Sequence, residues 1–182
     1  MSSPVRVLDE LDAELRAASG LVREVPDFPE PGVLFRDISP MLADGRALAA
    51  VVAALGRGHD FDVVAGVEAR GFLLGAAVAQ AHGTGVVGLR KPGKLPEVAH
   101  RVDYRLEYGS ASLELPAGTL RAGQRVLVVD DVLATGGTLN AACELVRSAG
   151  SEVAAATVVL ELTALGGRNK VPDVALHALL TA

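Results

Sequence analysis

The sequence has few aromatic residues, no tryptophan and only one cysteine. Aromatic residues make up 3% of its 182 residues, so a surface that stacks several nucleic-acid bases in a row is not expected. The single Cys143 cannot form an intramolecular disulfide, which favours a reducing compartment and predicts a cytoplasmic protein. A surplus of positive charge is also missing, because the formal net charge is −5, whereas neutralising nucleic-acid phosphates needs grouped lysine and arginine. We therefore expect no nucleic-acid partner.

Long hydrophobic runs are missing as well. The most apolar stretches, residues 47–55 and 153–160, are shorter than the roughly 20 residues of a membrane-spanning helix. Residues 1–18 contain four acidic side chains where a secretion signal needs an uninterrupted apolar segment. The remaining composition, 50% hydrophobic and 21% charged, is that of a globular chain large enough for one compact core. We expect a single domain and no membrane partner.

The hydrophobic segments that are present alternate between two periods. Continuous apolar runs predict buried strands over residues 62–67, 86–89, 126–129 and 153–162. Stripes at helical spacing predict helices over residues 48–55, 71–81 and 139–146. Strands that are apolar on both faces and alternate with helices are typical of an α/β fold with a mostly parallel central sheet. Ligands of such sheets bind beyond the carboxyl ends of the strands, so we expect the site in the loops after Val67, Leu89 and Val129.

Two segments fit no regular element. Four prolines exclude regular structure through most of residues 25–40, yet the apolar residues between them indicate that the segment packs onto other parts of the protein. A short amphipathic helix is predicted before it, ending at Gly20. Residues 90–108 are rich in charge and turn residues and have no clear periodicity, which predicts a long loop.

Two segments match the residue spacing of known phosphate-binding motifs but lack the structural context that those motifs need. Gly83, Gly85 and Gly88 have the spacing of a dinucleotide-binding loop, but they follow a predicted helix and enter a strand, which is the reverse of the required order. Gly88, Gly93 and Lys94 complete most of a Walker A loop. A leucine replaces its magnesium-binding serine or threonine, and neighbouring prolines prevent the helix that must follow. We assign neither function.

The strongest signal is the segment VLVVDDVLATGGT, residues 126–138. A predicted strand leads to Asp130 and Asp131, and a turn of small residues then opens a helix. The turn consists of Ala134, Thr135, Gly136, Gly137 and Thr138. Its glycines let backbone N–H groups converge, its hydroxyls add donors, and the helix N-terminus supplies positive partial charge, which together suit a phosphate monoester.

The two carboxylates would repel that phosphate, so they are expected to face sugar hydroxyls or a magnesium-bound diol. The segment therefore predicts a ribose-phosphate site. The alternative is that Asp131 caps a helix and the glycines only turn the chain. Under the first interpretation, Gly136→Val should block phosphate binding and leave the fold nearly intact.

This segment resembles the phosphoribosyl diphosphate motif of the type I phosphoribosyltransferases. Three further segments, in the same order, resemble the adenine phosphoribosyltransferases of that family: FPEPGVLFRDISP (28–40), VEARGF (67–72) and RKPGKLPEVAHRVDYRLEYG (90–109). The resemblance implies one phosphoribosyltransferase domain over residues 1–182, assembled as a homodimer. Residues 1–40 would form an N-terminal helix and a small hood over the base, and residues 90–109 a flexible lid loop.

The resemblance also implies a reaction. Such a glycosyltransferase of purine salvage joins adenine to 5-phosphoribosyl 1-diphosphate, giving AMP and pyrophosphate, with Mg²⁺ bound through the substrate and water and no direct protein ligand. Displacement at the anomeric carbon needs cations near the departing pyrophosphate and carboxylates near the sugar. Arg70, and the lid residues Arg90, Lys91 and Lys94, are the candidates for the pyrophosphate. The alternative for the lid residues is a solvated basic loop.

Further residues are assigned by the resemblance alone. Glu107 is expected, together with Arg70, to be catalytic and to hold or accept a proton on the imidazole ring of the purine. The carbonyl of Leu34 would accept the adenine amino hydrogen, the N–H of Arg36 would face the ring acceptor, and Phe35 would stack on the base. Phe35 could equally pack the proline-rich segment down. The role of His100 is left open.

Two other functions are considered. The same ribose-phosphate motif occurs in enzymes for orotate, xanthine and hypoxanthine, but the FRDISP and LEYG segments argue against these bases. A regulator that binds phosphoribosyl diphosphate and contacts nucleic acid would need an added domain or a basic surface, and the acidic composition argues against it.

Overall fold

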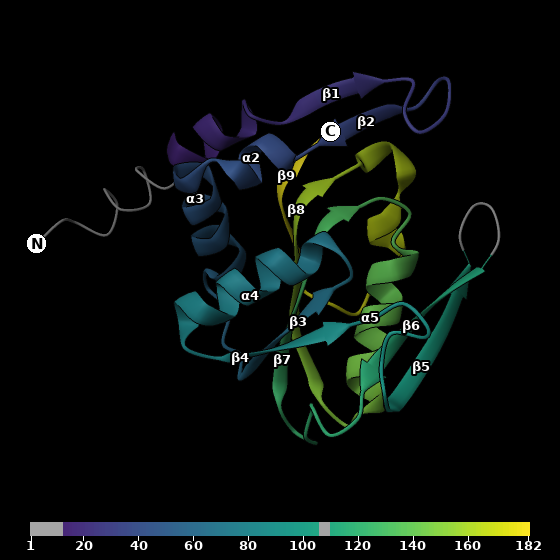
Figure 1. Ribbon diagram of the computed structural model, residues 1–182. Helices are drawn as coiled ribbons and strands as arrows, with labels where there is room; N and C mark the ends of the chain where they lie inside the picture. Colours follow the sequence, from purple (N-terminus) through teal and green to yellow (C-terminus); the bar gives the residue numbers. More distant parts are fainter. Residues whose placement is uncertain (1–12, 106–109) are drawn as a thin grey trace, which may run out of the picture. The chain divides into compact units, whose positions relative to one another are not determined.

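The computed structural model describes residues 13–105 and 110–182 (Figure 1). The chain divides into two compact units, Met1–Ala54 and Leu55–Ala182, and each is described by itself. The predicted hood segment falls in the first unit and the predicted ribose-phosphate segment in the second. That all 182 residues form one functional domain stays a prediction.

The first unit consists of a helical segment, a hairpin and two further helices. Residues 13–19 are helical. The other elements are β1 (Arg23–Pro26), β2 (Leu34–Asp37), α2 (Ser39–Ala43) and α3 (Gly45–Gly56), the last of which ends just inside the second unit. α3 contains the predicted helix and begins earlier, because the Asp44 carboxylate accepts the N–H groups of Arg46 and Ala47. Hydrogen bonds from Ser39 and Arg23 lower the pKa of Asp37 to about 2.

The expectation that prolines exclude regular structure through most of residues 25–40 is wrong. β1 and β2 pair antiparallel, with Val25 opposite Phe35. Two of the prolines lie in the connection between these strands. Pro40 lies in the first turn of α2, where a helix needs no N–H donor. The prolines therefore end elements rather than prevent them.

The second unit is built on a parallel sheet. Its strands and the helices that connect them are β3 (Val63–Val67), α4 (Arg70–His82), β4 (Gly85–Leu89), β7 (Arg125–Leu133), α5 (Gly137–Ser148), β8 (Glu152–Glu161) and β9 (Leu176–Thr181). The strand order is β4-β3-β7-β8-β9, and every neighbouring pair is parallel. The predicted α/β class with a parallel central sheet is confirmed, and β9 is an additional edge strand that the sequence analysis did not identify.

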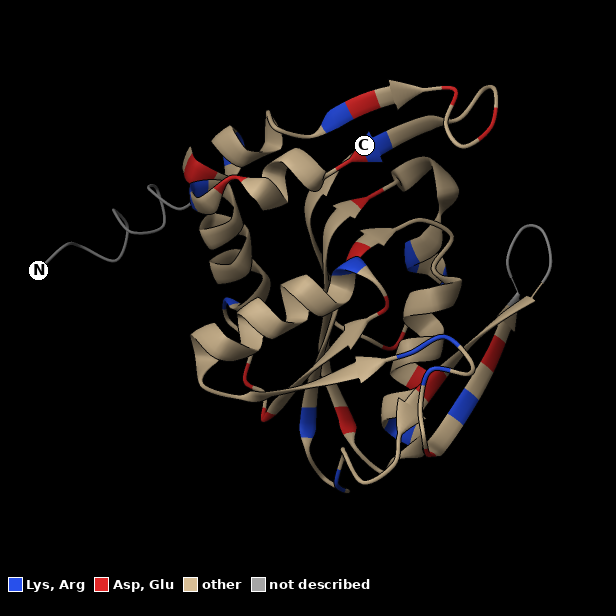
Figure 2. Ribbon diagram, viewed as in Figure 1, with Lys and Arg blue, Asp and Glu red and all other residues tan. Residues whose placement is uncertain are grey.

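The two long helices of this unit cover opposite faces of the sheet (Figure 1). α4 packs against β3, β4 and β7, while α5 packs against β7 and β8. The apolar face of α5, including Leu139 and Val146, is buried with Val126 and Val128 of β7 in one core cluster. Figure 2 shows no charged residue in β3 or β4, and in β8 charged residues stand only at its two ends. Within the described residues, no helix is long and apolar enough to span a membrane.

A second hairpin corrects the predicted lid loop over residues 90–109. β5 (Val98–Arg105) pairs antiparallel with β6 (Ser110–Pro116), so much of the expected loop is a strand. Val102 and Tyr104 pack against the core cluster, whereas Arg101 and Asp103, on the alternate positions, are exposed. The strand period of two is therefore present, but tyrosine and histidine at the inward positions make it weak. Glu107 lies outside the described residues.

Two short 3₁₀ helices complete this unit, η1 (Thr163–Leu165) and η2 (Gly167–Lys170). Arg168 holds η2 in place: its Nε donates to Glu161 Oε1 at 3.1 Å and one of its terminal nitrogens donates to the Leu176 carbonyl at 2.7 Å. These contacts tie η2 to the ends of β8 and β9.

Candidate active site

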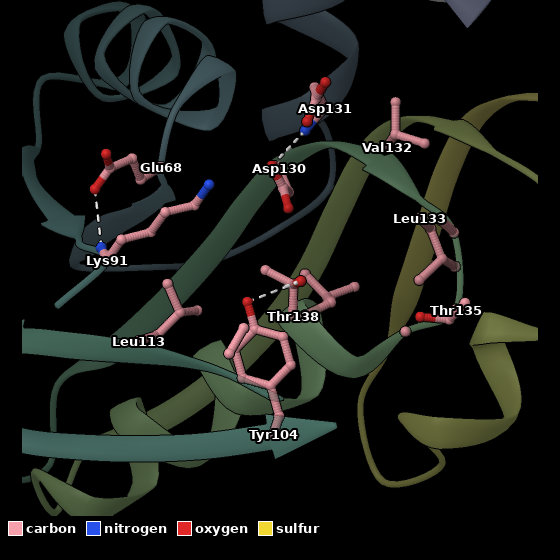
Figure 3. Close-up of a pocket in the computed structure, with 14 residues that line it drawn as sticks. Glu68, Lys91, Tyr104, Leu113, Asp130, Asp131, Val132, Leu133, Thr135 and Thr138 are labelled. Carbon is pink, nitrogen blue, oxygen red and sulfur yellow. Dashed lines mark hydrogen bonds between the residues drawn. The ribbon is translucent and has the colours of Figure 1, made fainter. Parts of the chain in front are cut away.

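A cavity of about 310 Å³ lies at the carboxyl ends of β3 and β7 (Figure 3). The chain leaves these neighbouring strands in opposite directions, through α4 to β4 and through α5 to β8. Such a reversal opens a crevice between two loops, which is where open α/β sheets bind ligands. The cavity is lined by residues that follow Val67, Leu89 and Val129.

One wall of the cavity is the turn that the sequence predicts as a phosphate site. Ala134, Thr135, Gly136 and Thr138 line the cavity, and Gly137 is the first residue of α5. The Asn140 N–H bonds back to the Gly136 carbonyl at 2.9 Å, so the N–H groups of the preceding helical residues have no partner within the helix. Unpaired N–H groups and the helix dipole make this wall suitable for an anion.

Gly136 has a structural role that differs from the expected one. Its φ is +81°, and a Cβ atom there would lie 2.2 Å from the carbonyl oxygen of Gly167. A Cβ on Gly167 would in turn lie 2.2 Å from the Ala134 carbonyl oxygen. The expectation that Gly136→Val leaves the fold nearly intact is therefore wrong, because two backbone segments touch at this point.

Asp130 and Asp131 lie within β7 rather than after it, because the strand continues to Leu133. Successive side chains of a strand alternate between its faces, and Figure 3 shows the two carboxylates pointing in different directions. The Asp131 N–H donates to Asp130 Oδ1 at 2.8 Å. Asp131 Oδ2 lies 2.8 Å from Arg70 Nε, in an ion pair that lacks the alignment of a hydrogen bond.

The environment of Asp130 favours its protonated form. Asp130 is 7% exposed, and burial together with the negative charge of Asp131 raises its pKa well above the ordinary value. Arg70 opposes this shift but is the weaker influence. A carboxyl group with a raised pKa holds a proton more readily, and its protonated form can donate a hydrogen bond to a sugar hydroxyl as well as accept one.

The opposite rim is organised by Glu68, which follows β3. Its Oε2 accepts the Lys91 N–H at 2.8 Å and Arg90 Nε at 3.1 Å, and these two bonds lower the pKa of the Glu68 carboxyl group. The Arg90 guanidinium also lies 5.5 Å from the centroid of the Phe72 ring. Lys91 lines the cavity, and Figure 3 shows its side chain extending away from Glu68 toward β7. The exposed Lys94 is not part of the lining.

The approach of α4 to the sheet places Arg70 beside Asp131. A Cβ on Gly71 would lie 2.8 Å from the Val129 carbonyl oxygen, and a Cβ on Gly66 would lie 2.6 Å from the Gly71 carbonyl oxygen. The bare backbones of β3, β7 and the first turn of α4 are thus in direct contact. Arg70, the first residue of that helix, reaches the end of β7 for this reason.

The residues predicted to bind the base are found in the first unit. Leu34, Phe35 and Arg36 belong to β2, and Leu34 is 45% exposed. The Phe35 ring packs edge-on against Phe28, with 5.1 Å between ring centroids, which supports the packing role considered for it. Arg36 forms an ion pair with Glu24 on β1. His100 is half-buried on β5.

Sequence reasoning did not single out several lining residues. Glu68 and Tyr104 are polar residues that line the cavity, and Ala111, Leu113 and Leu139 add an apolar wall. Glu68 and Tyr104 lie inside the segments that carry the family resemblance. The resemblance predicts the segments, but it assigns no role to these two residues. Among the described residues, no group of three or more histidine, cysteine, aspartate or glutamate side chains could hold a metal ion.

Comparison with known proteins identifies the family. A family model for the phosphoribosyl transferase domain matches residues 36–174. An adenine phosphoribosyltransferase of Kineococcus radiotolerans is 57% identical over 174 residues, covering 91% of this chain and 94% of that protein. The crystal structure of adenine phosphoribosyltransferase from Thermoanaerobacter pseudethanolicus has a TM-score of 0.88 at 43% identity, covering 92% of this chain and 99% of that one.

The enzyme from Saccharomyces cerevisiae, in complex with adenine and D-2,5-dideoxy-2,5-imino-altritol 1,6-bisphosphate, has a TM-score of 0.86 at 32% identity, covering 92% of this chain and 98% of that one. A parallel sheet with a cavity at its switch point and a glycine-rich turn at a helix start thus define a phosphoribosyltransferase, and the chain belongs to that family. Within the family it groups with the adenine phosphoribosyltransferases, enzymes of purine salvage that form AMP. The resemblance seen in the sequence is confirmed.

Proposed function

We propose that the cavity between β3 and β7 is where this enzyme joins adenine to 5-phosphoribosyl 1-diphosphate, releasing pyrophosphate and AMP. One observation carries the proposal: an anion-binding turn, an aspartate pair and a lysine line a single cavity at the switch point of the sheet. A ribose phosphate carries an anion at one end and hydroxyls along its ring. The anion suits the turn, and the hydroxyls suit the aspartate pair.

The turn Ala134–Thr138 binds the 5-phosphate, with its N–H groups and the Thr135 hydroxyl as donors, because the Thr138 hydroxyl donates to Tyr104. Asp130 and Asp131 face the ribose hydroxyls. The raised pKa of Asp130 supports this role, because a carboxyl group that holds a proton more readily repels a neighbouring phosphate less. The alternative considered for these residues, a helix cap at Asp131, does not apply, because Asp131 lies in a strand.

The pyrophosphate occupies the rim formed by Arg70, Arg90 and Lys91. Arg70 and Arg90 are held by Asp131 and Glu68, so their charges are already positioned and need not be ordered when substrate binds. As the bond at the anomeric carbon breaks, negative charge grows on the leaving group, and fixed cations stabilise it more in the transition state than in the ground state. The exposed Lys94 lies outside the cavity lining, and its assignment to the pyrophosphate rests on the sequence resemblance alone.

The base is recognised by β2 and by Glu107. The Leu34 carbonyl and the Arg36 N–H present an acceptor and a donor, which match the amino group and ring nitrogen of adenine and mismatch those of hypoxanthine. Phe35 stacks on the ring, and Glu107 holds or accepts a proton on its imidazole part. The yeast relative in complex with adenine supports adenine as the base.

Mg²⁺ would be held through the substrate and water, with no direct protein ligand. It favours oxygen ligands and retains several waters, so diphosphate oxygens, ribose hydroxyls and water would supply its coordination shell. Asp130 and Asp131 would orient those hydroxyls and waters. The ion supplies charge neutralisation of the diphosphate.

The protein acts in the cytoplasm as a homodimer. Its only cysteine is buried and unpaired, which suits a reducing compartment. Leu73 on α4 is 64% exposed in a single chain, and covering it with a second copy would remove that apolar surface from water.

The test is formation of AMP and pyrophosphate from 5-phosphoribosyl 1-diphosphate and Mg²⁺ with adenine, hypoxanthine or guanine. We expect a kcat/KM for adenine about 10⁴-fold higher than for hypoxanthine, the discrimination that an unpaired buried polar group can provide. Comparable values for adenine and hypoxanthine would contradict the assigned base. Binding of phosphoribosyl diphosphate without turnover on any base would support a regulator instead.

A further inference from the structure

Tyr104 connects the β5–β6 hairpin to the anion-binding turn. The Thr138 hydroxyl donates a hydrogen bond to the Tyr104 hydroxyl oxygen at 3.2 Å, although the two residues are 34 positions apart. Both residues line the cavity, Tyr104 from β5 and Thr138 from the first turn of α5 (Figure 3). The phenol therefore stands beside the turn that the proposed function assigns to the 5-phosphate.

The direction of this hydrogen bond leaves one donor uncommitted. A tyrosine hydroxyl can accept from one neighbour and donate its own proton to another. The oxygen is occupied by the Thr138 hydroxyl, and no acceptor for the Tyr104 O–H is found among residues 13–105 and 110–182. Tyr104 is half-buried at the cavity wall, so its O–H group can donate a hydrogen bond to a ligand bound in the cavity.

The Tyr104 ring is held firmly enough to present that donor. It packs against the core cluster beneath α5, and it pairs across the hairpin with Ala111, which also lines the cavity. Leu113, two residues further along β6, is 1% exposed and belongs to the same core. The position of the hydroxyl is thus set by packing rather than by a flexible side chain.

We propose that Tyr104 is a substrate-binding residue, whose O–H donates to a non-bridging oxygen of the 5-phosphate bound at Ala134–Thr138. The turn supplies donors from one side, and the phenol supplies one from the hairpin side. Because the same phenol also accepts from Thr138, it fixes the Thr138 hydroxyl before the ligand arrives. This inference rests on the proposed phosphate role of the turn.

The experiment compares three ligands by calorimetry: AMP, ribose 5-phosphate and inorganic pyrophosphate. Tyr104→Phe removes the hydroxyl and keeps the ring. We expect its Kd for AMP and ribose 5-phosphate to rise about 10-fold or more, the effect of losing a hydrogen bond to a charged group. Its Kd for pyrophosphate should stay within about 2-fold, because pyrophosphate lacks the sugar phosphate.

Ser112→Ala is the matched control. Ser112 is a hydroxyl residue on the same hairpin, hydrogen-bonded to Asp103 on β5, and it is not part of the cavity lining. Its loss should leave all three Kd values unchanged. Should Ser112→Ala weaken AMP as much as Tyr104→Phe does, the hairpin as a whole would be responsible and the inference would be overturned.

Thr138→Val separates this inference from the function on which it rests. Weaker AMP binding in Thr138→Val, with unchanged binding in Tyr104→Phe, would retain the phosphate site and reject the role of Tyr104. Unchanged binding in both variants would reject a role for either hydroxyl, whereas absence of AMP and ribose 5-phosphate binding in the parent protein would reject the phosphate site itself. An equal loss of AMP and pyrophosphate affinity in Tyr104→Phe would also reject the inference, because the hydroxyl would then support the structure of the cavity rather than bind the 5-phosphate.

Discussion

The Nε atom of Arg70 lies 2.8 Å from Oδ2 of Asp131, joining the first turn of α4 to the end of β7. The side chain of Asp131 is 13% exposed and that of Arg70 is 35% exposed, so the pair lies at the boundary between the protein interior and the cavity. Under the proposed function, it connects Asp131, assigned to the ribose, with Arg70, assigned to the pyrophosphate. Substitutions at this pair should therefore affect catalysis through both parts.

Asp131→Asn should lower kcat/KM for phosphoribosyl diphosphate by about 10-fold or more, since a charged partner of both the ribose and Arg70 is lost. The melting temperature should fall by only a few degrees, because asparagine keeps the shape and the backbone N–H bond to Asp130. Asp62→Asn is the control: Asp62 forms an ion pair with Arg125 at 2.9 Å, just before β3 begins, and should leave kcat/KM unchanged. A stability loss without a kinetic one in Asp131→Asn would show that the pair is only structural.

Gly136→Ala should destabilise the protein by about 2 kcal/mol or more and abolish AMP binding, because a methyl group cannot fit 2.2 Å from the Gly167 oxygen at a positive φ. Chemical denaturation and calorimetry measure the two effects. Gly118 also has a positive φ, +70°, but its Cβ position is open. Gly118→Ala should therefore cost only about 1 kcal/mol and leave AMP binding intact. Equal losses in the two variants would exclude the contact with Gly167 as the cause.

The raised pKa of Asp130 predicts how stability depends on pH. The folded protein holds this proton more tightly than the unfolded chain, whose aspartate pKa is near 3.8. The favourable contribution is therefore complete below that value and is lost as the pH rises toward the folded pKa. Asp130→Asn should match the parent in stability at pH 4 and have the higher Tm at pH 8, while losing activity.

Asp103→Asn serves as a comparison, because the pKa of Asp103 is shifted in the direction opposite to that of Asp130. Hydrogen bonds from Ser112 and Arg101 lower the pKa of Asp103, so its contribution is present above the unfolded value and is lost as the pH falls below it. This variant should have a lower Tm than the parent at pH 8. An Asp130→Asn variant that is less stable than the parent at pH 8 would contradict the assigned protonation state.

Cys143 should react with thiol reagents only when the protein unfolds. Burial raises the pKa of this thiol to about 11, so about one thiol in a thousand is ionised at pH 8, and the side chain is inaccessible. The rate of iodoacetamide labelling should follow the population of unfolded protein as denaturant is added. Labelling of the native protein at the rate of a free cysteine peptide would refute this prediction.

The elements that could be predicted are those whose own sequence pattern shows which residues are buried. β3 and residues 126–129 of β7 are continuous apolar runs, and α5 carries an apolar stripe, so their positions follow from the local sequence pattern. The turn at residues 134–138 was identifiable because glycines and threonines at a helix start have a local physical meaning. β5 could not be identified, since its inward side includes Tyr104, whose burial depends on a helix far away in the sequence.

The contacts that complete the site depend on partners distant in the sequence. Gly136 is required by Gly167, and Asp131 is held by Arg70, from a helix whose close approach needs Gly71. No pattern within one segment contains this information. The base-binding residues of β2 and the catalytic Glu107 stay predictions, the latter because it lies outside the described residues.

The contact between Gly136 and Gly167 also sets when the site can form during synthesis. A ribosome releases the phosphate-binding turn well before it releases η2, and the turn then lacks the backbone that supports Gly136. A nascent chain that ends before Gly167 should therefore be unable to bind nucleotide, although it contains the whole ribose-phosphate segment. Ligand cannot guide the earlier stages of folding, and the enzyme acquires its binding capacity only after Gly167 has left the ribosome.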